Sequence, residues 1–306
     1  MKGMNQRVLL FWVVFLTATL AVPGQFLEPS DVNALPSKPA DHRIAYGSEP
    51  LQFADLRLPA GRGPHPVAIV IHGGCWVSQF ADVQNTAALA DALRDAGVAT
   101  WNIEYRRTDN PGGGWPGTFL DVARAADHLR EISTKYNLDS KRVVAIGHSA
   151  GGHLALWLAA RHRLTEDSTL YVKEPLRLHG AIVLGGLGDL KASRAHLQGV
   201  CGGQDVVAAL LGGTPDQVPD HYRQGSPAEL VPLGIPQVFI TGAQDRVIPP
   251  EFAEAYEELA QRAGDKVRHI VVENAAHHEY NAPTSTTWPV VRDSVLSLVE
   301  IKPRRR

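Results

Sequence analysis

Two features of the sequence predict an α/β fold built on a mostly parallel sheet. Short apolar runs alternate along the chain with longer segments in which apolar residues recur at helical spacing. Several of the runs, such as PVAIVIH at 66–72, are nearly unbroken, as expected for strands buried on both faces of a parallel sheet. Strands that alternate with helices are joined by right-handed crossovers, so we expect helices on both faces of the sheet.

The individual elements follow from the same pattern in chain order. Residues 51–59 alternate as a strand does, and residues 117–136 carry Phe119, Val122, Ala126 and Leu129 on one helical face. The expected strands are 51–59, 66–72, 97–105, 142–147, 180–184, 237–241 and 267–272. The expected helices are 85–96, 117–136, 150–161, 251–263 and 285–299.

Some segments depart from this alternation. Residues 25–43 are rich in Pro, Ser and Asp without periodicity, which indicates a linker before an α/β domain at 44–302. Residues 191–227 mix short helical pieces with paired glycines and are interpreted as an insertion or lid. It would lie over the carboxyl ends of the strands, where α/β sheets place their sites. Residues 303–306 form a short basic tail, which we interpret as solvated.

The N-terminus predicts export. Lys2 and Arg7 precede the apolar run 8–22, which Pro23 and Gly24 interrupt. This pattern is typical of a signal peptide at 1–24, and the run is short for a membrane span. An uncleaved N-terminal membrane anchor is the alternative. In an exported protein Cys75 and Cys201 could form a disulfide, although two cysteines make no framework.

Composition excludes several classes of function. A net charge of −2 gives no electrostatic reason to expect nucleic acid or an acidic membrane surface as a partner. The 13 histidines are scattered, and neither cysteine has metal-ligand spacing, so no metal and no cofactor are expected. An apolar content of 44% describes an ordinary folded protein. The oligomeric state is not predicted.

The motif GHSAG at 147–151 places Ser149 between an expected strand and an expected helix. Such a turn forces strained backbone angles on the serine and brings neighbouring backbones close. Side chains at Gly147 and Gly151 would clash there. The serine hydroxyl would project beside the start of a helix, where backbone N–H groups and the helix dipole favour an oxyanion. The motif therefore indicates a nucleophilic serine, with Ala150 as an oxyanion donor.

The motif HGGCW at 72–76 follows directly on another expected strand. Glycines at a strand end can be simple turn residues. An oxyanion hole, however, needs a second N–H donor from another loop, and glycine lets the backbone approach the substrate. We therefore expect further donors among Gly73, Gly74 and Cys75.

The acid and the base should follow the serine in that order, each after its own strand. Asp245 follows the strand at 237–241, and His277 and His278 follow the strand at 267–272. The predicted triad is Ser149, Asp245 and His277. The rival for the acid is Asp189, and the rivals for the base are His148, His153 and His278.

These motifs together resemble the α/β-hydrolase superfamily, in particular its esterase/lipase-like, kynurenine formamidase and prolyl-oligopeptidase-like members. The resemblance covers about 45–298 and rests on HGGCW, IEYRR, GHSAGGHLA, SPAEL, ITGAQDRVIP and AAHHEYNAPTSTTW. It implies an α/β-hydrolase fold, places the base at His277 and puts His278 where the family often has an aromatic residue. Trp76, Tyr105, Trp115 and His278 are candidate pocket residues, although Tyr105 and Trp115 could equally be core aromatics.

The resulting hypothesis is an exported serine hydrolase that cleaves small carboxylic esters through an acyl-enzyme. Amide hydrolysis, as in an aryl formamidase or an exopeptidase, is the alternative. A non-catalytic binding module on the same fold is a remote third possibility, since every catalytic role is filled. The expected partner is a small ester or amide.

Overall fold

The computed structural model describes residues 26–300 and contains one eight-stranded sheet in the order β1-β2-β4-β3-β5-β6-β7-β8. Antiparallel pairing is confined to β1 with β2 and β2 with β4, and the remaining neighbours are parallel. The strands are β1 His42–Ala45, β2 Phe53–Arg57, β3 His65–Ile71, β4 Ala99–Ile103, β5 Leu138–His148, β6 Gly180–Leu184, β7 Gln237–Gly242 and β8 Val267–Val272.

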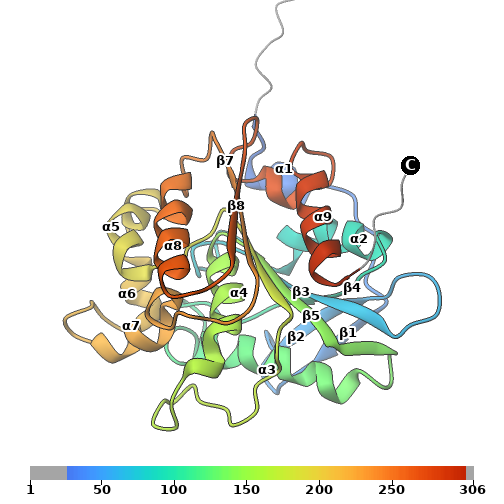
Figure 1. Ribbon diagram of the computed structural model, residues 1–306, viewed down its shortest axis with the longest axis horizontal. Helices are drawn as coiled ribbons and strands as arrows, with labels where there is room; N and C mark the ends of the chain where they lie inside the picture. The colour runs from blue at the N-terminus through green and yellow to red at the C-terminus, as the bar shows by residue number, and fades with distance from the viewer. Residues whose placement is uncertain (1–25, 301–306) are drawn as a thin grey trace, which may run out of the picture.

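Helices cover both faces of this sheet (Figure 1). The α-helices are α1 Pro29–Asn33, α2 Ala87–Asp95, α3 Gly117–Ile132, α4 Ala150–Ala160, α5 Leu190–Val200, α6 Val206–Leu211, α7 Pro219–Gly225, α8 Pro250–Arg262 and α9 Trp288–Leu298. Short 3₁₀ helices are η1 Val83–Thr86, η2 Arg161–Arg163, η3 Pro227–Glu229 and η4 Glu279–Asn281.

The core consists of two layers, one on each face of the sheet. Alternate residues of the central strands point to opposite faces, so Ile69 belongs to one layer and Val70 to the other. Helices α3, α4 and α8 supply the first layer, and α2 and α9 supply the second. The apolar face predicted for 117–136 is buried, as Phe119 and Leu129 show.

The predicted strands correspond to observed strands, and the differences lie at the ends of elements. The strand expected at 142–147 begins earlier, at Leu138, and a register shift in its pairing with β3 accommodates the extension. The helix expected at 85–96 is divided into η1 and α2, because Asp82 accepts a hydrogen bond from the N–H of Gln84 and starts a tighter turn first.

The segment 25–43, expected to be a linker, instead packs against the domain over the part that is described. Helix α1 buries Val32, and Asn33 accepts a hydrogen bond from the Asn85 side chain at 3.1 Å. His42 already belongs to β1. The helix is too short to show apolar periodicity, which is why the sequence pattern missed it. Glu28 and Asp31 cap it reciprocally.

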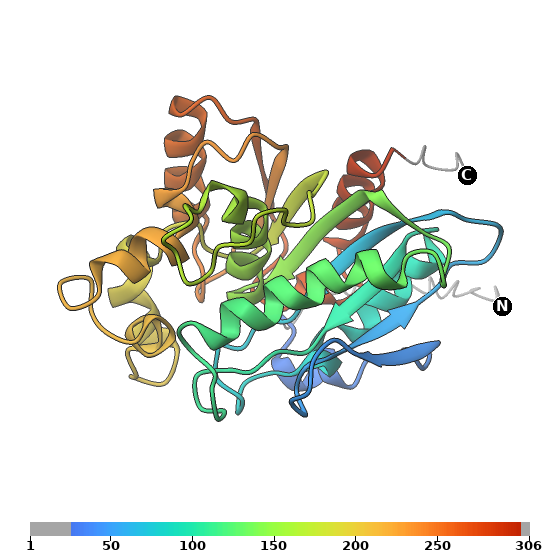
Figure 2. The same ribbon diagram turned by 90° about the horizontal axis from the view of Figure 1, so that it is seen from below.

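The insertion expected at 191–227 is the helical segment α5–α7 between β6 and β7, and Figure 2 shows it, coloured yellow to orange, at one end of the molecule. The predicted signal peptide at 1–24 and the basic tail at 303–306 lie outside the described residues. Across residues 26–300, none of the helices has both the length and the apolar character needed to cross a bilayer.

Candidate active site

The three residues of the predicted triad follow three strands that run parallel in the sheet. Ser149 follows β5, Asp245 lies in the loop after β7, and His277 lies in the loop after β8. Because β5, β6, β7 and β8 pair in parallel, their carboxyl ends lie at one edge of the sheet. The loops that carry the three side chains therefore meet there.

Ser149 occupies a strained turn between β5 and α4. Its backbone angles are φ 54° and ψ −120°, in a region that non-glycine residues rarely adopt. Its N–H donates to the carbonyl oxygen of Leu184 at 2.9 Å, which ties the turn to β6. A Cβ at Gly151 would overlap the carbonyl oxygens of Ile71 and His72, and one at Gly147 would overlap the carbonyl of Gly151. The clash predicted from the motif is confirmed.

Asp245 and His277 form a buried hydrogen-bonded pair. His277 Nδ1 lies 2.9 Å from Asp245 Oδ2. Because a carboxylate oxygen accepts, we infer that Nδ1 carries the proton, which leaves Nε2 as a free acceptor. Asp245 Oδ1 accepts from the N–H groups of Val247 and Ile248 at 2.9 and 2.8 Å. The carboxylate is thus held by its own loop and presented to His277.

Tyr280 adds a further hydrogen bond to this carboxylate. Its hydroxyl donates to Asp245 Oδ2 at 3.1 Å and accepts from the N–H of Gly242. Burial and the charge of Asp245 raise the pKa of Tyr280, so the hydroxyl stays protonated. The sequence analysis missed this residue, although an aromatic residue after the histidine pair was part of the quoted motif.

His148 links the nucleophile turn to the histidine loop. Its Nε2 donates to the carbonyl oxygen of His277 at 2.8 Å, and the two rings lie 4.6 Å apart. Burial, with the neighbouring histidines, lowers the pKa of His148 and keeps the ring neutral. Among residues 26–300, the Ser149 hydroxyl makes no hydrogen bond with another side chain, whereas the neighbouring His148 joins the nucleophile turn to the backbone of His277.

The HGG loop lies directly beside the nucleophile. A Cβ at Gly73 would sit 3.0 Å from Ser149 Cβ. Gly74, Cys75 and Trp76 have φ of 95°, 51° and 56°, so three consecutive residues adopt left-handed backbone. Within the described part of the chain, the N–H groups of Gly73, Gly74 and Cys75 donate to no other group. Together with the N–H of Ala150, the first residue of α4, these are free donors, and Gly73 lies against Ser149.

A buried charged cluster supports this loop from behind. Glu104 accepts from His72 Nε2 at 3.0 Å, from Arg107 at 2.8 Å and from the N–H of Val83 at 3.0 Å. Burial alone would raise the pKa of Glu104, but His72, Arg107 and backbone N–H donors outweigh it and hold the pKa at about 2. The cluster therefore keeps its charge and fixes the end of β3.

Tyr105 belongs to this support and not to a substrate pocket, which corrects one expectation. Its side chain is fully buried, its ring stacks on His72 at 4.4 Å, and its hydroxyl donates to the His72 carbonyl at 2.9 Å. Trp76 is likewise enclosed, at 1% exposure, against His153. Neither side chain is positioned to touch a substrate, because neighbouring side chains cover both.

The other two pocket candidates, Trp115 and His278, each pack against a histidine ring. Trp115 is partly exposed and stacks on His221 at 4.2 Å. His278 packs edge-on against His277 at 5.1 Å, and burial, with the neighbouring His277, lowers its pKa to about 4. His278 therefore stays neutral at neutral pH, in the packing position that an aromatic residue would occupy.

The rival acid and base residues have structural roles. Asp189 caps α5, with Oδ1 accepting from the N–H groups of Lys191 and Ala192. His153 is buried on α4 and donates from Nε2 to the Gly225 carbonyl at 2.8 Å. Residues 26–300 contain no group of three or more His, Cys, Asp and Glu side chains arranged to hold a metal ion.

The chain belongs to the BD-FAE family, whose profile matches residues 54–259. It is 28% identical over 244 residues to Esterase LipC of Mycobacterium tuberculosis, covering 77% of this chain and 59% of that protein. It is 24% identical to a probable isoprenylcysteine alpha-carbonyl methylesterase, ICMEL1, of Arabidopsis thaliana, covering 76% of this chain and 50% of that protein. The chain thus spans little more than half the length of these relatives.

Solved structures share the fold. A truncated carbohydrate esterase from gut microbiota superposes with a TM-score of 0.70 at 22% identity, covering 84% of this chain and 95% of that chain. An esterase of Thermogutta terrifontis gives 0.69 at 18% identity, covering 88% of this chain and 96% of that chain. The α/β-hydrolase fold predicted from the motifs is confirmed.

Proposed function

We propose that this protein is a serine hydrolase that cleaves small carboxylic esters. The observation that carries the proposal is the His277–Asp245 hydrogen bond of 2.9 Å at the sheet edge where the strained Ser149 turn and the free N–H groups of the HGG loop also lie. Membership of the BD-FAE family and the esterase names of the curated relatives support the same reaction class.

In the proposed reaction Ser149 Oγ attacks the ester carbonyl while His277 Nε2 takes the hydroxyl proton. The N–H groups of Gly74 or Cys75 and of Ala150 bind the resulting oxyanion. His277 then gives the proton to the departing alcohol. Water attacks the acyl-enzyme through the same base and releases the carboxylic acid. The Ser149–His277 hydrogen bond forms with substrate bound, as catalytic hydrogen bonds often tighten only in that complex.

Asp245 holds His277 in the tautomer that this reaction needs. Its carboxylate accepts from Nδ1 and stabilises the imidazolium that forms on Nε2. Tyr280 and the N–H groups of Val247 and Ile248 keep the carboxylate in place.

Short acyl groups are the proposed substrates. Ser149 is only 7% exposed and His277 only 5%, so the approach to the site is narrow. The helices of the insertion are short, and α6 buries its apolar residues against the domain instead of presenting them to a long chain. We expect activity to fall beyond acyl chains of roughly eight carbons, since a longer chain needs an apolar channel to cover it.

Export is proposed as well. The Cys75–Cys201 disulfide is a bond that persists in oxidising compartments, which suits a secreted or periplasmic protein. Expression with the natural N-terminus, followed by mass spectrometry of the mature protein, tests this. A chain shortened by about 20–24 residues outside the cytosol supports export, and an intact cytosolic chain refutes it.

The activity is tested with p-nitrophenyl esters from acetate to palmitate, beside N-formylkynurenine as an amide. We expect turnover of the short esters and a loss of several orders of magnitude in Ser149→Ala. Asp245→Asn should lose about 10⁴-fold through the wrong tautomer. A larger loss in Asp189→Asn than in Asp245→Asn would reject the acid, and preferred cleavage of the amide would reject the substrate class.

His278→Phe is the matched control for His277→Ala. His277→Ala should fall to the level of Ser149→Ala, because members of a triad act as a unit. His278→Phe keeps an aromatic ring in the packing position and should stay active. An inactive His278→Phe with an active His277→Ala would move the base to His278.

A further inference from the structure

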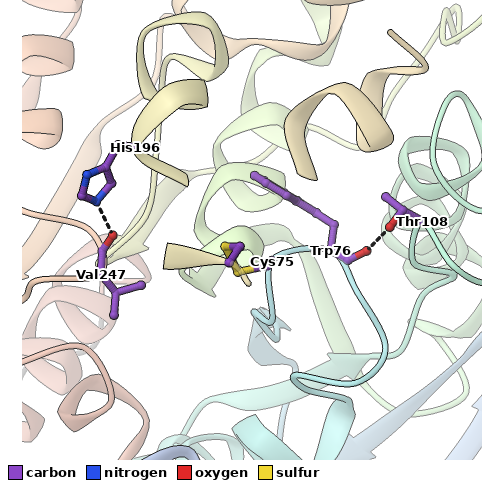
Figure 3. Close-up of a disulfide and its surroundings, with 6 residues drawn as sticks. Cys75, Trp76, Thr108, His196 and Val247 are labelled. Atoms are coloured by element: carbon purple, nitrogen blue, oxygen red, sulfur yellow. Dashed lines mark hydrogen bonds between the residues drawn. A yellow bond between two sulfur atoms is a disulfide. The ribbon is translucent and has the colours of Figure 1, made fainter. Parts of the chain in front are cut away.

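Helix α5 touches both loops that complete the proposed active site. Its last turn leads into Cys201, which is joined by a disulfide to Cys75 in the HGG loop, 126 positions away in the chain. Near the middle of the helix, His196 Nε2 donates to the carbonyl oxygen of Val247 in the Asp245 loop at 2.9 Å. Figure 3 shows the disulfide at Cys75 and the hydrogen bond between His196 and Val247.

The disulfide meets the HGG loop at its most strained point. Cys75 has a φ of 51°, in the left-handed region that L-residues other than glycine rarely adopt. Trp76, the next strained residue, is held by other means, since its carbonyl accepts from the N–H and hydroxyl of Thr108 at 2.8 and 3.0 Å. The Cys75 side chain is covalently joined to Cys201.

The contact with the acid loop also bears on a functional group. The N–H of Ile248 donates to Asp245 Oδ1 at 2.8 Å, and the carbonyl oxygen of the same peptide group, that of Val247, accepts from His196. The peptide that caps the carboxylate is therefore held from the α5 side as well. The His196 ring packs against Phe252 of α8, which limits its movement.

Helix α5 is fixed to the fold independently of these two contacts. Asp189 caps its start, and the Leu190 N–H donates to Ser226 Oγ at 3.1 Å. Arg194 pairs with Asp205 at the start of α6, and Leu197 is buried in the core. A helix anchored in this way can transmit a constraint to the loops it touches.

We propose that α5 is a brace that positions the oxyanion loop and the acid loop relative to each other, with Cys75, Cys201 and His196 as its positioning residues. The inference rests on the proposed esterase function. The disulfide keeps Cys75 in the left-handed conformation that aims the N–H groups of the loop at the oxyanion. Without it, an L-residue at this position relaxes toward negative φ and the donors move away from Ser149. The loss is confined to the transition state, so kcat falls and KM stays.

Glycine at position 75 separates this role from general stabilisation. Glycine populates positive φ as readily as negative φ, so it needs no tether to adopt the left-handed conformation. Cys201→Ser breaks the disulfide and leaves an L-residue at position 75. The double variant Cys75→Gly/Cys201→Ser breaks the same disulfide but removes the strain. Both variants lose the tether equally, and they differ in the backbone preference of residue 75.

The experiment measures kcat and KM for p-nitrophenyl acetate in the full mature chain. For Cys201→Ser we expect kcat to fall at least about 10-fold, with KM within about 2-fold of the wild-type value. Complete loss of an oxyanion donor lowers kcat by about 10²–10³-fold, and here the donor is displaced instead of removed. In Cys75→Gly/Cys201→Ser we expect kcat to recover to within about 3-fold of the wild type, because the glycine restores the loop. A trifluoromethyl ketone, which occupies the oxyanion hole, should lose affinity in parallel with kcat.

Lys191→Ala is the matched control, since Lys191 is exposed on the same helix and outside both contacts. It should keep wild-type kinetics, and His196→Ala should lower kcat without the glycine rescue. Equal kcat in Cys201→Ser and the wild type overturns the inference, as does a loss that glycine does not restore. If Cys201→Ser does not fold, wild-type enzyme reduced with a phosphine and shown by circular dichroism to be folded replaces it. An inactive wild type rejects the proposed function instead, which keeps the two failures distinct.

Discussion

The nucleophile turn and the HGG loop lie side by side, yet they are stabilised in different ways. In the turn, the contacts that require glycine at 147 and 151 come from the turn itself and from the end of the neighbouring strand β3. In the HGG loop, Cys75 and Trp76 adopt left-handed backbone without being glycine. Their anchors are Thr108, His153 and Cys201, which are distant in the sequence. The nucleophile turn is thus specified by its own backbone and the adjacent strand, whereas the HGG loop is specified by side-chain contacts with residues distant in the sequence.

This difference explains why one motif could be interpreted fully from the sequence and the other only in part. A glycine at a fixed spacing from a serine predicts a close approach of backbones, which the sheet supplies in any parallel α/β fold. A cysteine and a tryptophan after two glycines carry no such local meaning. Their conformation depends on partners that no spacing identifies.

The largest expected effect comes from a substitution in the nucleophile turn. In Gly151→Ala the new Cβ would overlap the carbonyl oxygens of Ile71 and His72 at the end of a central strand. Backbone there has no room to move, so we expect a loss of more than about 4 kcal/mol in the free energy of unfolding, the exceptional range for a point mutation. Urea denaturation measures it.

Gly199→Ala is the control for this variant. Gly199 lies in α5, and a Cβ there would meet no atom within 4 Å. Replacing a helical glycine by alanine should stabilise the protein by up to about 1 kcal/mol. Similar stabilities for Gly151→Ala and Gly199→Ala would contradict the claim that close backbone approach specifies the turn.

The next largest effect is expected from removing the Cys75–Cys201 disulfide, which anchors the HGG loop. The Cys75–Cys201 disulfide closes a long stretch of chain, with a sequence separation of 126, and constrains the unfolded state accordingly. Cys75→Ser/Cys201→Ser should lower the free energy of unfolding by roughly 2–5 kcal/mol. The reduced wild type should unfold at the same urea concentration as the double variant. An unchanged midpoint in both would show that the disulfide does not constrain the chain.

Most of the fold could be predicted from the sequence, because the apolar pattern of each short segment indicates whether it forms a buried strand or a helix. Each expected strand is present, and strand position alone could order Ser149, Asp245 and the pair His277–His278, while the resemblance to the family chose His277. What the sequence did not predict depends on contacts between distant residues. Tyr280 on Asp245, His148 on His277 and α1 on the domain each join groups whose spacing carries no signal. The role of Tyr105 stayed open between pocket and core, because an aromatic residue after a strand gives the same sequence pattern whether it faces substrate or core.

The third effect concerns the contact between the nucleophile turn and the HGG loop. His153 follows the nucleophile turn, and its ring meets Trp76 of the HGG loop edge-on at 5.4 Å. Burial lowers the pKa of His153 from 6.5 to about 4, so the native protein holds it neutral. The unfolded chain takes up the proton below about pH 6.5, and the native state only near pH 4. Stability from this group is therefore complete above pH 6.5 and is lost as the pH falls through that window.

His153→Phe tests this coupling through the slope of stability against pH. A pKa difference of this size is equivalent to about 3 kcal/mol between pH 7 and pH 4. Phenylalanine keeps the edge contact with Trp76 but cannot protonate, so the fall in unfolding free energy over that range should become shallower by about that amount. Losing the donor to Gly225 adds an offset that does not vary with pH. A slope equal to that of the wild type would contradict a buried neutral His153.

The smallest effect concerns a long-range hydrogen bond made by a side chain of the nucleophile turn. His148 precedes Ser149, and its Nε2 donates to the carbonyl of His277, 129 positions away. His148→Phe retains a ring of similar size but leaves that buried carbonyl without a donor, at a cost of about 1–3 kcal/mol in stability. The histidine loop should then shift relative to Ser149, and kcat for p-nitrophenyl acetate should fall about 10-fold, since small misplacements of catalytic groups reduce rates steeply. His148→Gln, whose side-chain amide can donate to the same carbonyl, should recover part of the rate. If His148→Phe keeps the wild-type kcat, the nucleophile turn positions Ser149 without the hydrogen bond between His148 and His277.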